Sequence, residues 1–310
     1  MNRILKQTGE FMVGLGILAL LVYRIGFHEI TSTFASIEIG YLLVMMLMTA
    51  IVLFVYPLSL IILYAPIKED HLGLRQLFRL RMITQILGNL TPNKLGELLI
   101  FALIKRRYKV NQMPIFILFT LDKFTTVIHA LAFSAVGFFF LFEDGNTTIL
   151  FIGLAILCIF GVIMAPLFIR RLQKVVWTLF KMRRLDAMLK KISTFLGSFL
   201  RQHPQYVVCN LLLTTLSYFL TACVVKLAFL ALNTDVSLTT IFFISNMVAV
   251  AALIPLNIPL FGIKELSGIY LYSLIGISAA VATQVVIATT VAKYLNYIVL
   301  YFIFSERGYT

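Results

Sequence analysis

Residues 89–97 read NLTPNKLGE, and they interrupt an apolar segment that covers residues 82–104. A second apolar segment, residues 238–276, is interrupted by IPLNIPLFG at residues 254–262. Each interruption combines proline, which cannot continue a helix, with glycine and polar side chains. Irregular backbone at membrane depth is tolerated only where protein or a cavity surrounds it. The two interruptions therefore predict two broken helical hairpins inside a membrane protein.

The composition of the whole chain agrees with a membrane location. Of its 310 residues, 61% are hydrophobic and only 13% are charged, and the mean hydropathy is +0.98. Soluble domains carry about 25% charged residues, so an ordinary soluble enzyme is excluded. Besides the two interrupted segments, six apolar segments are long enough to span a bilayer, the first of them interpreted as a retained anchor. They are residues 11–27, 40–65, 114–142, 148–169, 205–232 and 278–304.

The distribution of charge predicts the orientation. The formal net charge is +13, and 20 of the 26 Lys and Arg residues lie in both termini, the loops 66–81 and 105–113, and the segment 170–204. The loops between these regions contain Glu and Asp but no Lys or Arg. By the positive-inside rule the basic set faces the cytoplasm. We therefore expect a multi-pass protein of the cytoplasmic (inner) membrane with both termini cytoplasmic, and the basic excess does not indicate a nucleic-acid partner.

This orientation predicts an inverted repeat. Residues 82–104 have basic loops on both sides, so they are expected to re-enter the cytoplasmic face, and residues 238–276 are expected to re-enter the outer face. Two spans, a hairpin and a span then occur twice, in residues 1–142 and again, inverted, in 143–310. The predicted fold is an all-α polytopic membrane protein with six spanning helices and two re-entrant broken hairpins, in one membrane domain. Secondary transporters share this layout and bind their substrates where the breaks meet.

Ionisable residues at membrane depth predict the site. Inserting one ionisable side chain at the centre of a membrane costs at least about 2.5–3.5 kcal/mol, so such a side chain should face a cavity or a partner. Thr91 and Pro92 favour a new helix start, whose free N–H groups beside a lysine would suit a phosphate. The alternative is that Lys and Glu at each break form local ion pairs. The predicted substrate-binding residues are Asn89, Thr91, Lys94, Glu97, Lys264, Glu265 and, in the final span, Lys293.

Four of the ionisable residues are candidates for proton coupling: Glu97, Asp122, His129 and Glu265. His129 follows Asp122 by two helical turns on the same face, which permits a relay, although a hydrogen-bonded structural histidine is the alternative. Lys226, near the end of its span, is expected to snorkel to the interface. The chain contains no metal-ligand spacing, catalytic motif or cofactor fingerprint, so we predict no metal, no cofactor and no enzymatic activity.

Residues 170–201 predict a basic amphipathic helix, because apolar residues recur at helical spacing between lysines and arginines. Such a helix is suited to lie on the anionic inner leaflet. Packing of its apolar face against the rest of the protein is the alternative.

The chain resembles the membrane domain of the lysylphosphatidylglycerol synthase/flippase family. Three features carry the resemblance: the first interruption, the basic turn that follows it, and the pair Asp122-Lys123. That family has a proline turn ending in Gly-Glu in its first half, here Pro92 to Glu97. Its second half has a turn rich in proline and glycine that ends in Glu, here Pro255 to Glu265, although this copy is poorer in glycine. A basic residue follows in the final span, where Lys293 replaces the common Arg. The resemblance covers nearly the whole chain.

The full-length synthases also carry a soluble aminoacyl-transferase domain, and this chain stops at Thr310. The resemblance therefore implies flipping of an anionic phospholipid or a lipid-linked saccharide rather than aminoacylation, with a phospholipid or polyprenyl-linked lipid as the partner. One alternative is a membrane-embedded transferase that acts on a lipid carrier, with Glu97 or Glu265 as the base. Another is a non-catalytic membrane partner of a lipid-modifying enzyme.

Overall fold

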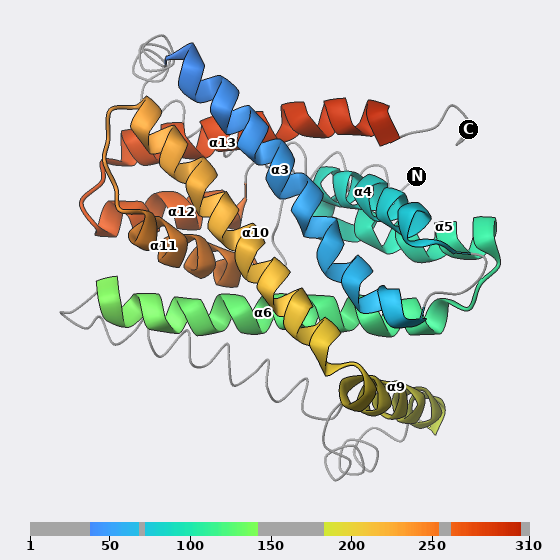
Figure 1. Ribbon diagram of the computed structural model, residues 1–310. Helices are drawn as coiled ribbons and strands as arrows, with labels where there is room; N and C mark the ends of the chain where they lie inside the picture. The colour runs from blue at the N-terminus through green and yellow to red at the C-terminus, as the bar shows by residue number, and fades with distance from the viewer. Residues whose placement is uncertain (1–37, 68–71, 142–182, 254–261, 305–310) are drawn as a thin grey trace, which may run out of the picture.

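The computed structural model describes residues 38–67, 72–141, 183–253 and 262–304 (Figure 1). All regular structure in these ranges is helical, as the sequence predicts. The elements are, in chain order, α3 (Ile39–Tyr64), η1 (Ala65–Ile67), α4 (Leu74–Leu90), η2 (Pro92–Leu98), α5 (Leu99–Tyr108), α6 (Gln112–Leu141), α9 (Arg183–Gln202), α10 (Pro204–Ala231), α11 (Leu238–Ala251), α12 (Ile263–Leu274) and α13 (Ala279–Phe304).

Four of these helices, α3, α6, α10 and α13, are long and apolar enough to cross a membrane. They coincide with four of the predicted spans, because an apolar run of more than about 20 residues satisfies its backbone best as one helix. The other two predicted spans, residues 11–27 and 148–169, lie outside the described residues.

The long helices form a crossed framework. Figure 1 shows α3 and α10 crossing the molecule side by side in opposite directions, with α6 along one edge and α13 along the other. The short helices α4 and α5 lie at one end of this framework, and α11 and α12 lie at the other. The first predicted break is confirmed as an interruption, since η2 separates α4 from α5. Residues 254–261 of the second predicted break lie outside the described residues, which end with α11 and its last turn before them and resume just before α12. Re-entry of these hairpins from a membrane face stays a prediction.

Two apolar cores correspond to the two ends. The first joins the C-terminal part of α3 and the N-terminal part of α6 with α4, α5 and α9. The second joins the C-terminal part of α10 and the N-terminal part of α13 with α11 and α12. Each broken helix pair is thus packed on a different half of the long helices.

The helix α9 confirms the amphipathic prediction from residue 183 onwards. Ile192, Leu196 and Phe199 are buried in the first core, whereas Lys191 and Arg201 are exposed. Packing against the protein, the alternative reading, therefore holds for these three apolar side chains. Contact of the basic face with the anionic leaflet stays a prediction, and residues 170–182 lie outside the described part.

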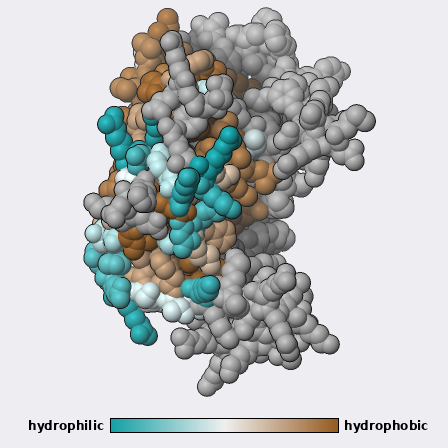
Figure 2. Space-filling model, turned by 90° about the vertical axis from the view of Figure 1, so that its right-hand side faces the viewer, coloured by the Kyte–Doolittle hydropathy of each residue, from teal (hydrophilic) through white to brown (hydrophobic). Residues whose placement is uncertain are grey.

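The end of the molecule that carries α4 and α5 is strongly polar. Figure 2 shows hydrophilic side chains gathered on this end, next to hydrophobic surface. Arg75, Lys105, Arg106 and Lys109 are exposed here. These residues belong to the loops that the charge distribution assigns to the cytoplasm.

Candidate functional site

The first break is formed by local backbone chemistry. Thr91 is extended, with φ −113° and ψ 147°, because the residue before a proline is disfavoured in a helix. Its hydroxyl accepts the N–H of Gly96 at 2.7 Å, and the same oxygen lies 3.1 Å from the carbonyl of Gly88. Thr91 therefore terminates α4 and begins η2, as predicted, although it caps the N–H of Gly96 rather than one in the first turn.

Two glycines allow η2 to lie directly against α4. A Cβ on Gly96 would lie 2.4 Å from the carbonyl carbon of Leu87, and a Cβ on Gly88 would lie 2.5 Å from Cγ of Glu97. Real Cβ atoms do not approach other atoms this closely, so both positions require glycine. This contact brings Glu97 against the last turns of α4.

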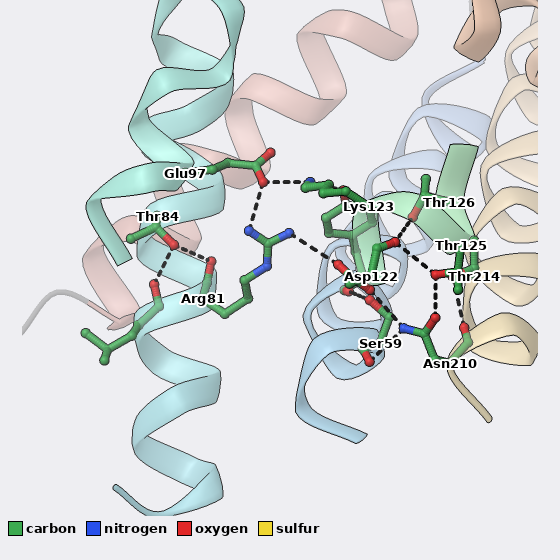
Figure 3. Close-up of polar contacts among 12 residues, drawn as sticks. Ser59, Arg81, Thr84, Glu97, Asp122, Lys123, Thr125, Thr126, Asn210 and Thr214 are labelled. Carbon is green, nitrogen blue, oxygen red and sulfur yellow. Dashed lines mark hydrogen bonds and ion pairs between the residues drawn. The ribbon is translucent and has the colours of Figure 1, made fainter. Parts of the chain in front are cut away.

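Glu97 is the centre of a buried charge network (Figure 3). Its Oε2 accepts from Nη1 of Arg81 at 2.9 Å and from Nζ of Lys123 at 2.7 Å. Arg81 is completely buried and also approaches Asp122, with 4.0 Å between Nη2 and Oδ2. Burial by itself raises the pKa of the Glu97 carboxyl, but Lys123 and Arg81 outweigh burial and hold this pKa well below its usual range. The network contains two cations and two anions and is electrically balanced.

Polar groups of the long helices support this network. Asn210 of α10 donates from Nδ2 to Oδ1 of Asp122 at 2.9 Å and to the carbonyl of Ser59 in α3 at 2.9 Å. Thr125 of α6 donates to Oδ1 of Asn210 at 2.6 Å (Figure 3). Lys123 donates to the hydroxyl of Tyr56 at 3.0 Å. The first break is therefore bound directly to α6 through Lys123, and further side-chain hydrogen bonds join this part of α6 to α3 and α10.

Sequence reasoning missed the role of Arg81. We assigned it to the cytoplasmic loop 66–81 because it stands at the edge of an apolar segment, but it lies two turns inside α4 and is buried. Leu77, Thr84 and Gln85, at helical spacing from Arg81, are buried as well. Helical periodicity extended back through residue 77 could have identified Arg81 as inward-facing.

Three predicted site lysines come together from different elements. Lys94 of η2 and Lys264 of α12 are exposed, Lys293 of α13 is half-buried, and each lies within electrostatic range of the other two. The hydroxyl of Tyr294 lies 3.4 Å from the carbonyl of Asn89, which places α13 beside the end of α4. The lysines of both breaks and of the final helix therefore lie close enough to interact electrostatically.

Two of these lysines have a carboxylate within electrostatic range, Glu97 for Lys94 and Glu265 for Lys293. Within the described ranges, none of the three forms an ion pair. Glu97 instead pairs with Arg81 and Lys123, and Oε2 of Glu265 accepts the N–H of Gly262 at 2.9 Å. The alternative of a local Lys–Glu ion pair at each break is therefore not what the described side chains form.

The two remaining predicted polar groups have structural contacts. The side chain of Asn89 donates to the carbonyl of Gln85 at 2.9 Å. His129 is buried against the rings of Phe133 and Tyr218, and neither of its ring nitrogens has a hydrogen-bond partner among the described residues. In the described structure no hydrogen bond joins His129 to Asp122, so a proton relay between them stays a prediction.

A metal site is not formed by the described residues, which contain no group of three His, Cys, Asp or Glu side chains arranged to hold an ion.

Lys226 was expected to snorkel, and it donates to Asp235 and to the carbonyl of Val236 in the loop after α10. It therefore has its own partners and lies apart from the three site lysines.

Comparison with known proteins gives one match. The model of a family described as the lysylphosphatidylglycerol synthase TM region matches residues 8–300. This range includes both breaks and all three site lysines. No match to a curated protein or to a solved structure was found.

Proposed function

Because the chain belongs to the lysylphosphatidylglycerol synthase transmembrane-region family, a family of membrane proteins with a lipid-related role, we propose that it translocates a lipid. The substrate is an anionic phospholipid or a lipid-linked saccharide, and the membrane is the cytoplasmic one. Lys94, Lys264 and Lys293 hold the headgroup while the hydrocarbon chains stay in the bilayer.

One observation carries this proposal: lysines from both breaks and from the final helix lie within electrostatic range of one another, and none of them forms an ion pair among the described residues. Lysines at such a position are costly unless a ligand or cavity compensates them. A phosphate accepts charge-assisted hydrogen bonds from ammonium groups and removes their mutual repulsion. A site at the meeting point of two broken helix pairs is also the arrangement that transporters use.

The helix directions support alternating access. The helices that correspond in the two proposed halves are α3 with α10 and α6 with α13, and each pair runs in opposite directions (Figure 1). The α4–α5 pair packs at one end and the α11–α12 pair at the other. In the proposal, each pair opens toward its own membrane face, and the basic end with α4 and α5 faces the cytoplasm.

The carboxylates favour translocation over the transferase alternative. A general base needs a carboxylate that is free to take a proton. Glu97 is engaged by two cations, and Glu265 accepts a backbone N–H. Both carboxylates therefore have charge-balancing or structural partners, which is consistent with a protein that binds and moves a lipid.

The proposal predicts that Lys94→Gln and Lys264→Gln each slow translocation tenfold or more. A hydrogen bond to a charged group contributes about 1.5–3 kcal/mol, and about 1.4 kcal/mol corresponds to a tenfold rate change. Purified protein in sealed liposomes is assayed with acyl-chain-labelled phosphatidylglycerol and, separately, acyl-chain-labelled phosphatidic acid, together with a membrane-impermeant quencher.

Lys191→Gln is the matched control, because Lys191 is an exposed lysine of α9. It should translocate at the wild-type rate. Equal rates for all three variants and the wild type would contradict the assignment of the lysines. No translocation by the wild type would contradict the proposed function and favour a non-catalytic partner of a lipid-modifying enzyme.

A further inference from the structure

We propose that the lipid headgroup carries two negative charges, as a phosphate monoester or a diphosphate does, and not the single charge of a phosphodiester. This inference rests on the proposed function and concerns the same site. It follows from the charges that surround the three lysines and from their number.

The buried network contributes no net charge to the site. Arg81 and Lys123 are balanced by Glu97 and Asp122, and the ion pairs have N–O distances of 2.7 and 2.9 Å around Glu97. Glu97 also lies within electrostatic range of Lys94, but its charge is already balanced by Arg81 and Lys123. The charge of the ligand is therefore compared with the summed charge of the three lysines and of Glu265, the acid beside them.

The lysine cluster has an excess of two positive charges. Lys94, Lys264 and Lys293 interact with one another, and Glu265 is the acid that interacts with Lys293. Three lysines against one glutamate leave two positive charges uncompensated among the described residues. Lys264 also lies in the first turn of α12, a helix of 12 residues whose N-terminal dipole favours a further negative charge.

The backbone of Lys94 is held in a costly conformation. Its φ is +56°, in the left-handed region that residues with a side chain rarely adopt. Such a conformation costs of order 1–3 kcal/mol and persists where the surroundings impose it, often at ligand-binding positions. Lys94 is exposed and lies within electrostatic range of Lys264 and Lys293, and a glycine at this position would lack that cation.

The number of donors matches the headgroup of a monoester. A phosphate monoester has three terminal oxygens and carries about −1.5 to −2 charges at neutral pH. Three ammonium groups can each donate to a different terminal oxygen. A phosphodiester has two such oxygens and one charge, so it would leave one lysine and one positive charge unmatched.

The test compares two lipids that differ by one methyl group. Phosphatidic acid and phosphatidylmethanol with identical acyl chains are titrated against the purified protein in nanodiscs of phosphatidylcholine, with binding measured by native mass spectrometry. We expect phosphatidic acid to bind at least tenfold more tightly at about pH 7. The preference should shrink at roughly pH 5, because the second ionisation of the monoester has a pKa of about 6. The charged and titratable groups around it are Lys94, Lys264, Glu265 and Lys293, together with Glu97, Lys123 and Tyr56, which lie within electrostatic range of Lys94.

Protein variants and a third lipid complete the design. Lys293→Gln should remove most of the preference for phosphatidic acid, whereas Lys191→Gln should keep it.

A polyprenyl monophosphate distinguishes the source of the headgroup. Tighter binding than phosphatidic acid indicates a polyprenyl carrier, and weaker binding indicates a diacyl lipid. Both results support a doubly charged headgroup. Equal affinities for phosphatidic acid and phosphatidylmethanol, both above phosphatidylcholine, would overturn this inference and leave the proposed function standing. Equal binding of all these lipids would overturn both.

Discussion

Glu97→Gln is expected to lower the free energy of unfolding by about 3–5 kcal/mol, the largest effect of any single charge removal in the described structure. The substitution keeps the shape of the side chain but removes the anion that pairs with Arg81 and Lys123. Arg81 is completely buried, so water cannot replace the lost carboxylate. An unpaired buried cation costs far more than the original ion pair contributed.

Denaturant or thermal unfolding in detergent measures this change. Asp235→Asn is the matched control, because Asp235 also pairs with a lysine, Lys226, but its side chain is 84% exposed. An exposed ion pair contributes about 0–1 kcal/mol, so this variant should unfold near the wild type. Equal, small effects of the two substitutions would show that Glu97 does not neutralise a buried charge.

Gly96→Ala is expected to have the second largest effect. The added Cβ would lie 2.4 Å from the carbonyl carbon and 2.5 Å from the carbonyl oxygen of Leu87. Both are backbone atoms, so no rotamer change relieves the contact and η2 must move away from α4. Forced shifts of this kind cost about 1–3 kcal/mol and occasionally more. Translocation should fall together with stability, because Lys94 and Glu97 move with η2.

Gly197→Ala provides the comparison. Gly197 lies in the exposed face of α9, and a Cβ there meets no atom within 4 Å. Alanine is favoured over glycine in a helix by about 1 kcal/mol, so this variant should be as stable as the wild type or more stable. If Gly96→Ala also left the melting temperature and the translocation rate unchanged, the close contact between η2 and α4 would be wrong.

Much of the fold could be predicted from hydropathy and from helix-breaking residues. The apolar runs at 40–65 and 278–304 are long enough to determine helices without knowledge of their neighbours. Pro92 sets the end of α4 through its own ring, since the restriction on Thr91 is local. The apolar spacing of Ile192, Leu196 and Phe199 likewise predicts one buried face of α9.

The partners of the charged groups could not be predicted in the same way. Glu97 bonds to residues 16 positions before it and 26 positions after it, and Asn210 reaches Asp122 across 88 positions. No local pattern specifies such contacts, because they depend on how separate helices pack. Arg81 was misplaced for a related reason: a basic residue at the edge of an apolar run has the same sequence signal whether it faces the cytoplasm or the core.

The prediction of the lysine site depended less on packing. Lys94 and Lys264 were identified because a charge beside a proline break needs compensation wherever the hairpins lie. Their proximity to each other, and to Lys293, required the two broken pairs to approach from opposite ends of the long helices. The structure provides this approach through the second core, which places α12 against the N-terminal part of α13.

Photocrosslinking of a lipid headgroup tests most directly whether η2 and α12 form one headgroup site. An anionic phospholipid with a photoreactive group on its headgroup is activated in proteoliposomes, and the labelled peptides are identified by mass spectrometry. The account predicts labels in both residues 92–98 and residues 263–274, and loss of both labels when excess phosphatidic acid is added. Labels confined to the exposed basic residues of α5 and α9 would contradict it.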